Sequence, residues 1–200
     1  MGFRYKKFIK LFLGIALILF GLINYACSPA GVLASGGATT MVVAEGDRSI
    51  GSVVDDATIK VNIAAKFINS GEGLFVNINT TVLEGRVLLT GIVDNQELRI
   101  EAVRLVWEIE GVREVINEIQ IGNRSKLKDY ASDLWITAQA KGVAAKTIGL
   151  RSIAYNFETI NGVLYVAGVT TRPDQVDDML VALKSIKGVK EIINYIVVKQ

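Results

Sequence analysis

Two glycine-bounded stretches decide the fold of this chain: GRVLLTG at residues 85–91 and GVLYVAG at residues 162–168. The second follows the first by 77 positions, and GVREVIN at 111–117 returns as GVKEIIN at 188–194 with the same spacing. Self-similarity at a fixed period is the signature of a repeated structural unit. The sequence therefore predicts two tandem copies of one small domain.

Each repeat opens with a helix pattern. In the first repeat, apolar residues recur at helical spacing and predict one buried helix face. They are Ala57, Val61, Ala64, Ala65 and Ile68. Asp56 and its counterpart Asp133 are expected at the starts of the first helices, where a carboxylate stabilises the helix dipole. This interpretation is preferred over a cation site at Asp55 and Asp56.

A β-hairpin follows in each repeat. Apolar or β-branched residues alternate with other residues over 76–82 and again over 153–159, the pattern of a half-buried strand. Glu-Gly at 84–85 and Asn-Gly at 161–162 then supply two-residue turns. Asn-Gly favours a type I′ turn because both of its positions need a positive φ. A return strand is expected directly after each turn.

The second helix of each repeat is expected to begin at a capping box, formed by Asp94 with Glu97 and by Thr171 with Asp174. A further strand follows each of these helices. A strand, a crossover helix and a strand usually pair in parallel with a right-handed connection. Each αββαβ repeat should therefore form a three-stranded mixed sheet with two helices on one face, which is an α+β fold.

Four glycines mark the same two places in both repeats. Gly111 and Gly188 are expected to end the second helices as left-handed caps. Gly91 and Gly168 lie inside strands, where a glycine is costly and usually marks a close approach of another backbone. We expect these two to be structural glycines under a helix that passes close over the sheet, and not ligand-binding positions.

Two αββαβ repeats, each with a mid-strand glycine and a Gly-Val-(Arg/Lys)-Glu-(Val/Ile)-Ile-Asn strand, resemble tandem BON domains. SDLWIT at residues 132–137 is similar to the dual-BON lipoproteins of the Gram-negative outer membrane. The resemblance implies domains at 49–123 and 124–200 and a non-enzymatic envelope protein. It also implies that the first helix of the second repeat contacts anionic phospholipid and that the protein supports outer-membrane integrity.

Residues 1–26 have the pattern of an export signal. The first ten residues carry four basic and no acidic side chains, and 11–23 is an apolar run. This run is shorter than a membrane-spanning helix, which needs about 20 residues. The segment therefore favours secretion over a permanent membrane anchor, although an inner-membrane anchor is the alternative.

Cys27 directly follows this segment, and Ala26-Cys27 resembles the lipid-attachment site of bacterial lipoproteins. Acylation there would place the protein at the periplasmic face of the outer membrane. Cleavage after Ala34 is the alternative and would give a soluble periplasmic protein. Residues 27–48 are rich in small residues and predict a flexible tether.

Composition limits the chemistry of the chain. It has no His and one Cys, which excludes the usual zinc sites, a His-based catalytic triad and a disulfide within the chain. Loss of the four basic residues of the export signal changes the net charge from +2 to −2, which is not the positive field of a nucleic-acid binder. We expect no enzymatic activity, no cofactor, no metal site and no nucleic-acid partner.

The two repeats have diverged in charge. Residues 50–123 have a net charge of −5, whereas residues 124–200 have a net charge of +4. The helix region 124–146 alone has a net charge of +3. A basic residue near an anionic bilayer contributes about 1 kcal/mol. The second repeat should therefore be drawn weakly, and in a salt-sensitive manner, to an anionic membrane.

Apolar and aromatic side chains accompany this charge. Leu134, Trp135 and Ile136 are consecutive, so one sheet cannot cover all three, and the position equivalent to Trp135 in the first repeat is Thr58. Aromatic residues beside lysines are typical of interfacial helices. The candidate phospholipid-binding residues are Leu127, Lys128, Tyr130, Leu134 and Trp135.

Two alternatives remain for these features. The protein could be an interaction module that docks on another envelope protein or a peptidoglycan-associated partner, through Trp135 or a free sheet edge. Trp135 could instead fill the contact between the two repeats, because small domains need such burial. Trp107 on the second helix of the first repeat is a further candidate for packing between the repeats.

Overall fold

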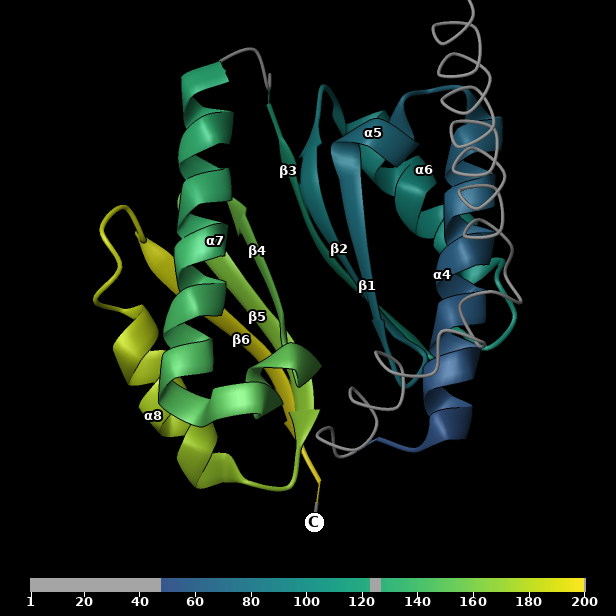
Figure 1. The fold of residues 1–200 in the computed structure, drawn as a ribbon. Helices are drawn as coiled ribbons and strands as arrows, with labels where there is room; N and C mark the ends of the chain where they lie inside the picture. Colours follow the sequence, from purple (N-terminus) through teal and green to yellow (C-terminus); the bar gives the residue numbers. More distant parts are fainter. Residues whose placement is uncertain (1–47, 123–126, 200) are drawn as a thin grey trace, which may run out of the picture. The chain divides into compact units, whose positions relative to one another are not determined.

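The computed structural model describes residues 48–122 and 127–199. The predicted export signal and the tether up to residue 47, Cys27 included, lie outside the described residues. The described residues belong to one unit, Val43–Gln200, in which two consecutive domains have the same order of main helices and strands (Figure 1).

Both domains contain two long helices, one short helix and three strands. The elements of domain 1 are α4 (Ile50–Ser70), α5 (Leu74–Asn77), β1 (Ile78–Leu83), β2 (Arg86–Val93), α6 (Gln96–Trp107) and β3 (Glu114–Ile121). The elements of domain 2 are α7 (Leu127–Ile148), the 3-10 helix η1 (Gly149–Ala154), β4 (Asn156–Ile160), β5 (Val163–Thr170), α8 (Pro173–Leu183) and β6 (Glu191–Val198).

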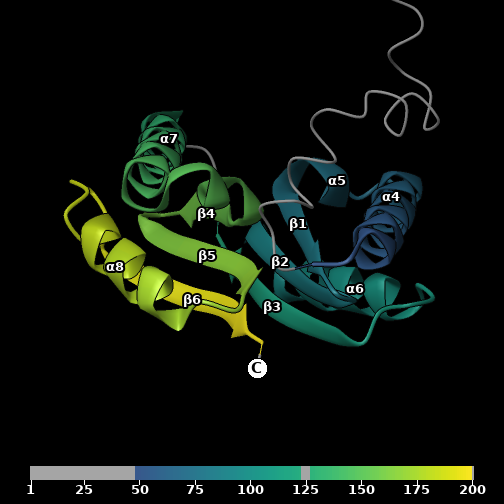
Figure 2. The ribbon, with the colours of Figure 1, turned by 60° about the horizontal axis from the view of Figure 1, so that its bottom comes forward.

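Each domain holds a three-stranded mixed sheet. The central strand β2 pairs antiparallel with β1 and parallel with β3, and β5 pairs in the same way with β4 and β6. In each domain both long helices cover one face of the sheet, α4 and α6 in domain 1 and α7 and α8 in domain 2 (Figure 2). The predicted α+β fold of two αββαβ repeats is confirmed. The first strands begin later than predicted, at Ile78 and Asn156, because residue 76 lies in α5 and residue 153 lies in η1.

The buried face of α4 differs from the predicted one. Ile59, Ile63 and Phe67, at i, i+4 and i+8, lie in the core of domain 1. Val61 and Ile68, which the sequence analysis assigns to the core, are 67% and 57% exposed. That prediction is wrong because α4 carries apolar residues on two opposite faces. The sheet buries the face with the larger side chains, which removes more apolar area from water.

The second helices do not begin at the predicted capping boxes. The N-cap of α6 is Asn95 and not Asp94, and the Asn95 Oδ1 accepts the N–H three residues on at 2.9 Å. The helix α8 begins at Pro173, and the residue at its N-cap is Arg172, not Thr171, without a capping side chain. Proline at the first helical position has no N–H, so this helix start has one donor fewer to satisfy.

The predicted glycine caps also lie beyond the helix ends. The residues after α6 and α8 have right-handed backbones. Gly111 and Gly188 follow a few residues later, with φ of +90° and +100°. The two glycines therefore form the left-handed turn that leads into the last strand of each domain, and the prediction that they cap the helices is wrong.

Gly91 and Gly168 lie against the segment that enters the first strand of their sheet. A Cβ at Gly91 would be 2.1 Å from the carbonyl oxygen of Asn77, at the end of α5. A Cβ at Gly168 would be 2.5 Å from the ring of Tyr155, which follows η1. Neither position has space for a side chain unless the neighbouring backbone or ring moves. At Gly168 the neighbour is the Tyr155 ring and not the helix that was expected above the sheet.

The sheet faces opposite the helices are buried as well, because side chains of both sheets form shared apolar clusters there. The buried members are Leu83, Leu88, Ala167 and Val169 in one cluster and Ile92, Ile160 and Tyr165 in the other. The central strands β2 and β5 are consequently buried on both faces. This explains why their sequences are nearly continuous apolar runs and do not alternate.

Candidate functional site

The helix α7 has one buried and one exposed apolar face. Ile136, Ala140 and Ala144 lie in the core of domain 2. On the opposite side, six apolar or small residues at helical spacing are exposed to solvent. They are Ala131, Leu134, Trp135, Ala138, Gly142 and Ala145. These six residues are termed the outward face of α7.

Two large side chains dominate the outward face of α7. Trp135 is 67% exposed and Leu134 is 52% exposed, whereas the next residue, Ile136, is 2% exposed. Large apolar side chains that are exposed side by side mark an interaction surface. The alternative in which Trp135 fills the contact between the repeats is therefore wrong. The prediction that Trp107 packs between the repeats is also wrong, because Trp107 is 53% exposed.

Lysines lie on both flanks of the outward face of α7. Successive residues of an α-helix are about 100° apart, which follows from 3.6 residues per turn. Lys141 therefore lies on the flank of Leu134, and Lys146 lies on the flank of Trp135. Both lysines are exposed. An apolar strip with a basic edge on each side fits a partner surface that has an apolar interior and negatively charged groups at its boundary with water.

The predicted phospholipid-binding residues fall into two groups. The structure brings Tyr130, Leu134 and Trp135 together on exposed parts of α7 within two helical turns. Leu127 and Lys128 form the first turn of the same helix, and their side chains lie outside the described part of the chain. The sequence analysis did not single out the small residues of the outward face, which helical spacing from Trp135 would have indicated.

The helix α4 presents an outward face at the equivalent positions. Its members are Val54, Ala57, Thr58, Val61, Ala65 and Ile68, all of them exposed. Of the two lysines of α4, Lys66 is ion-paired with Glu108, and this hydrogen bond lowers the pKa of the Glu108 carboxyl below its usual value. Sequence reasoning missed the outward face of α4 because it assigned Val61 and Ile68 to the core.

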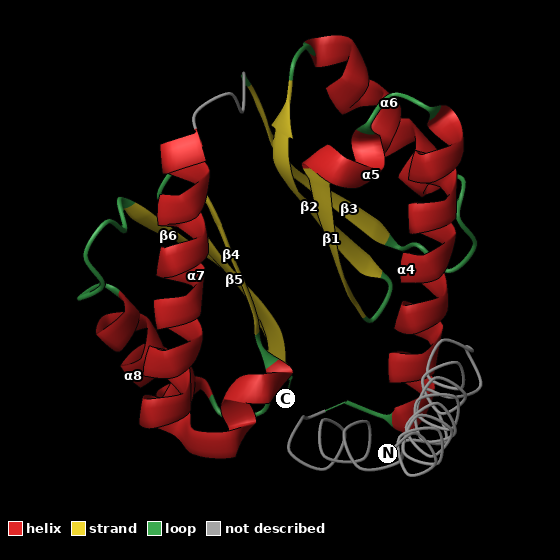
Figure 3. Ribbon diagram, turned by 45° about the horizontal axis from the view of Figure 1, so that its top comes forward, coloured by secondary structure: helices red, strands yellow, loops and turns green. Residues whose placement is uncertain are grey.

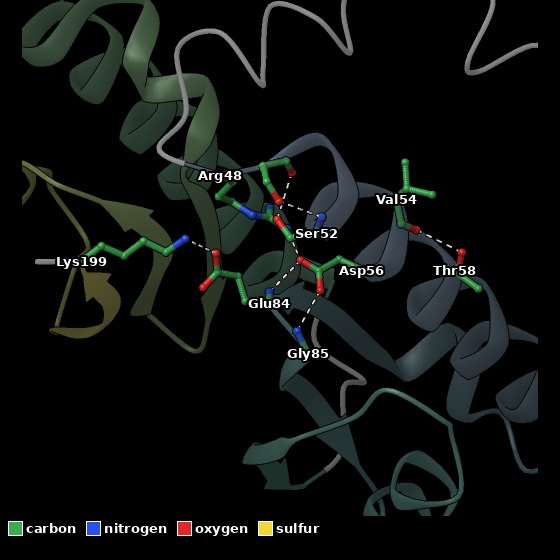
Figure 4. A network of polar contacts seen from close by, with 9 residues as sticks. Arg48, Ser52, Val54, Asp56, Thr58, Glu84, Gly85 and Lys199 are labelled. Carbon is green, nitrogen blue, oxygen red and sulfur yellow. Dashed lines mark hydrogen bonds and ion pairs between the residues drawn. The ribbon is translucent and has the colours of Figure 1, made fainter.

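Asp56 and Asp133 each tie a first helix to a hairpin turn. Asp56 accepts both N–H groups of the β1–β2 turn at 2.7 and 2.8 Å (Figure 4), and Asp133 accepts both N–H groups of the β4–β5 turn at 2.7 and 2.9 Å. Both residues lie in the second turn of their helix, so the predicted place at the helix start is wrong. Asp56 also forms an ion pair with Arg48. These two carboxylates therefore have a structural role.

Polar contacts join the two domains. Lys199 forms an ion pair with Glu84 in the β1–β2 turn (Figure 4). The Tyr195 hydroxyl donates a hydrogen bond to Glu118. Burial raises the pKa of Tyr195 above its usual value, and the Glu118 carboxylate raises it further. Within residues 48–122 and 127–199, no group of three or more His, Cys, Asp or Glu side chains is placed to hold a metal ion.

The fold defines a protein of two tandem α+β domains whose first helices are apolar on the outside. Residues 55–123 and 132–200 each match the BON domain family. Together these matches cover more than half of the chain, so the protein belongs to the BON family, and the resemblance seen in the sequence is confirmed.

Three relatives illustrate this membership. An uncharacterized protein in the gshII 5' region of Anaplasma centrale is 36% identical over 147 residues, which are 73% of this chain and 96% of the relative. The outer membrane lipoprotein DolP of Haemophilus influenzae is 27% identical over 180 residues, 88% of this chain and 91% of the relative. The osmotically-inducible protein Y of Escherichia coli K12 is 25% identical over 149 residues, 74% of both chains. No helix among the described residues is long and apolar enough to cross a membrane.

Proposed function

We propose that this protein is a non-enzymatic lipoprotein of the cell envelope that binds anionic phospholipid and supports outer-membrane integrity. The outward face of α7 would make the lipid contact, and Trp135 is the observation that carries the proposal. Its exposed indole lies next to the exposed Leu134, between flanks that bear Lys141 and Lys146. The relationship to an outer membrane lipoprotein, DolP of Haemophilus influenzae, supports the same cellular location.

Elementary energetics make the proposed contact reversible. Insertion of Leu134 and Trp135 below the headgroups would contribute about 2 kcal/mol for each side chain that is fully removed from water. Lys141 and Lys146 would each add about 1 kcal/mol beside an anionic surface, with their alkyl stems along the apolar strip. The gain is offset by the loss of translational freedom on binding. One helix face alone should therefore bind vesicles weakly.

A second attachment is proposed at Cys27, where acyl chains would enter the bilayer after removal of residues 1–26. One lipid chain with a basic, apolar patch is the usual combination for stable membrane association. The predicted flexible tether would end before Arg48, which is ion-paired with Asp56, and over residues 27–47 it would have a root-mean-square length of roughly 25 Å. That reach would let the outward face of α7 contact the leaflet that holds the acyl chains.

Co-sedimentation with vesicles tests the lipid contact. The chain from residue 45 onward retains every described residue and is mixed with neutral phosphatidylcholine vesicles or with anionic phosphatidylglycerol vesicles. We expect binding to the anionic vesicles only, and a loss of binding in Trp135→Glu. The matched control is Thr58→Glu, which places the same charge at the equivalent exposed position of α4. Equal binding by Trp135→Glu and Thr58→Glu would contradict the proposal.

A protein-interaction module is the second candidate, because exposed Trp and Leu side chains also anchor protein contacts. The salt dependence of binding distinguishes the two functions. Lipid binding through lysines should weaken as salt rises, whereas docking of Trp135 into an apolar pocket should not. Failure of the wild-type chain to sediment with either vesicle would favour the protein partner.

A further inference from the structure

A groove runs along one of the two outer strands of each sheet, β1 in domain 1 and β4 in domain 2. It has a volume of about 720 Å³ and is lined by parts of α4, α5 and β1 and by parts of α7, η1 and β4. β1 and β4 are each paired on one side only (Figure 3). At the groove, Asn79 of β1 donates a hydrogen bond to Glu158 of β4 at 2.6 Å. This space is termed the edge groove.

The hairpin geometry determines which backbone groups of β1 point into solvent. The β1–β2 turn has two residues, both with positive φ, and is flanked by the pair Leu83 and Arg86. In such a hairpin the flanking pair exchanges hydrogen bonds, and paired and unpaired residues then alternate along the strand. Thr80 is therefore a residue whose N–H and C=O point away from β2. Thr80 lines the edge groove, and its backbone makes no hydrogen bond outside the sheet among the described residues.

Apolar and basic side chains line the edge groove, and the acidic residue among its lining residues, Glu158, is hydrogen-bonded to Asn79. Phe75 and Ile153 are both exposed where they line the groove. Lys60 of α4 and Lys141 of α7 line it as well. Both lysines are exposed, and neither has a hydrogen bond or ion pair within the described part of the chain. An occupant with negative charge would complement them.

We propose that the edge groove binds an extended acidic segment of a partner protein, which adds to β1 as a further strand through the backbone of Thr80. Strand addition draws its affinity from main-chain hydrogen bonds and its specificity from side chains that alternate along the new strand. One set of those side chains would pack on Phe75 and Ile153. Acidic side chains would approach Lys60 and Lys141.

The backbone at the middle of the groove favours a peptide over a lipid acyl chain. An acyl chain laid along β1 would remove water from the N–H and C=O of Thr80 and offer no hydrogen bond in return. Burial of a polar group without a partner is costly. A peptide backbone supplies both a donor and an acceptor at that point. The proposal goes beyond lipid binding at the outward face of α7 and shares only Lys141 with the basic flanks of that face, whereas Lys60 and Thr80 belong to the groove alone.

A pair of substitutions at one residue tests the backbone contact. Thr80→Pro removes the outward N–H, which β2 does not use, and proline is tolerated on an edge strand in this orientation. Thr80→Ala removes the side chain and keeps the N–H. The probes are fluorescein-labelled peptides of roughly eight residues, the length of a strand, in which Glu alternates with Val or with Phe. The full chain is titrated into each peptide, and fluorescence polarisation is measured.

We expect the acidic peptides to bind wild type and Thr80→Ala with affinities within about twofold, and Thr80→Pro at least about tenfold more weakly. Peptides with Lys in place of Glu should bind wild type about tenfold more weakly, and Lys60→Glu should remove most of that preference, because the new carboxylate offsets Lys141. Amide hydrogen exchange at Thr80 should slow when the acidic peptide is bound. Thr80→Pro should retain binding to anionic vesicles, because Trp135 is untouched.

Several results would overturn the proposal. One is the absence of binding by every acidic peptide, and another is equal binding by Thr80→Pro and Thr80→Ala. A third is displacement of the peptide by dodecyl phosphate with no change in exchange at Thr80, which would assign the groove to an amphiphile. A misfolded Thr80→Pro is recognised by its circular dichroism, and the Lys60→Glu and hydrogen-exchange results then decide.

Discussion

The outward faces of α4 and α7 occupy the same place in their repeats and differ in chemistry. Both follow the same helical spacing, and both lie opposite a buried face that includes Ile59 in α4 and Ile136 in α7. The equivalent positions hold Thr58 in one helix and Trp135 in the other. Because the packing requirement of the fold is shared, the side chains that differ on the exposed face are not needed for the core and are available for the lipid contact proposed for domain 2.

The largest effect is expected from a comparison of the two faces of α4. Phe67→Ala should lower the free energy of unfolding by about 4 kcal/mol, because Phe67 is fully buried and its removal leaves a cavity. Val61→Ala, on the outward face, should change it by at most about 0.5 kcal/mol. Urea unfolding followed by circular dichroism measures both. Similar losses for the two variants would mean that the outward face of α4 is covered.

The two helix-to-turn carboxylates should differ in strength. Asp56→Ala should cost about 3 kcal/mol, because it removes two charge-assisted hydrogen bonds in a buried setting and leaves Arg48 without its partner. Asp133→Ala should cost about 1.5 kcal/mol, because its bonds to the turn are more exposed. Urea unfolding at neutral pH checks the order. A larger loss for Asp133→Ala would contradict it.

An exchange of residues between the helices tests whether their chemistry explains the difference. Trp135→Thr should weaken binding to anionic vesicles by about thirtyfold, which corresponds to the loss of about 2 kcal/mol of apolar burial. Thr58→Trp should raise binding by less, because domain 1 has a net charge of −5 and is repelled by the same surface. Co-sedimentation over a range of vesicle concentrations measures both. Equal gain and loss would show that charge is unimportant.

The smallest effect concerns the contact between the domains at alkaline pH. Burial, and then the Glu118 carboxylate, raise the pKa of Tyr195 above its usual value of 10.0. Above pH 10 the unfolded chain loses this proton while the native chain keeps it, so the free energy of unfolding falls as the pH rises toward the native pKa. Tyr195→Phe should make this fall less steep between about pH 9 and about pH 11. Urea unfolding across that range decides, and parallel curves would contradict the prediction.

Local sequence patterns predicted the strands better than the helices. The Asn-Gly turn at 161–162 fixed the position of the second hairpin, because few residue pairs tolerate two consecutive positive φ angles. The helix α4 was predicted with the wrong face inward, because its apolar residues satisfy helical spacing on two sides. The helix caps also differed by a residue or more, since several neighbouring side chains are able to cap the same N–H groups.

Only part of the candidate site could be predicted from the sequence, because residue spacing does not show which apolar face of a helix is covered. Trp135 could be singled out because its repeat partner, Thr58, is polar and the shared core has no need of an aromatic residue there. The residue spacing within α7 alone did not decide whether Trp135 is exposed to solvent or buried between the repeats. Only the packed structure leaves Trp135 in solvent, because the two sheets contact one another through strands and not through the first helices.

The sequence by itself determined the tandem repeat, the αββαβ order and the mixed sheets, because turns, glycines and periodicity are local properties of the chain. The tertiary structure alone decided which face of each first helix is buried, how the two sheets cover one another and where the edge groove lies. These features depend on the partner surface that each apolar face meets. A periodic pattern records that a face is apolar and does not record what covers it.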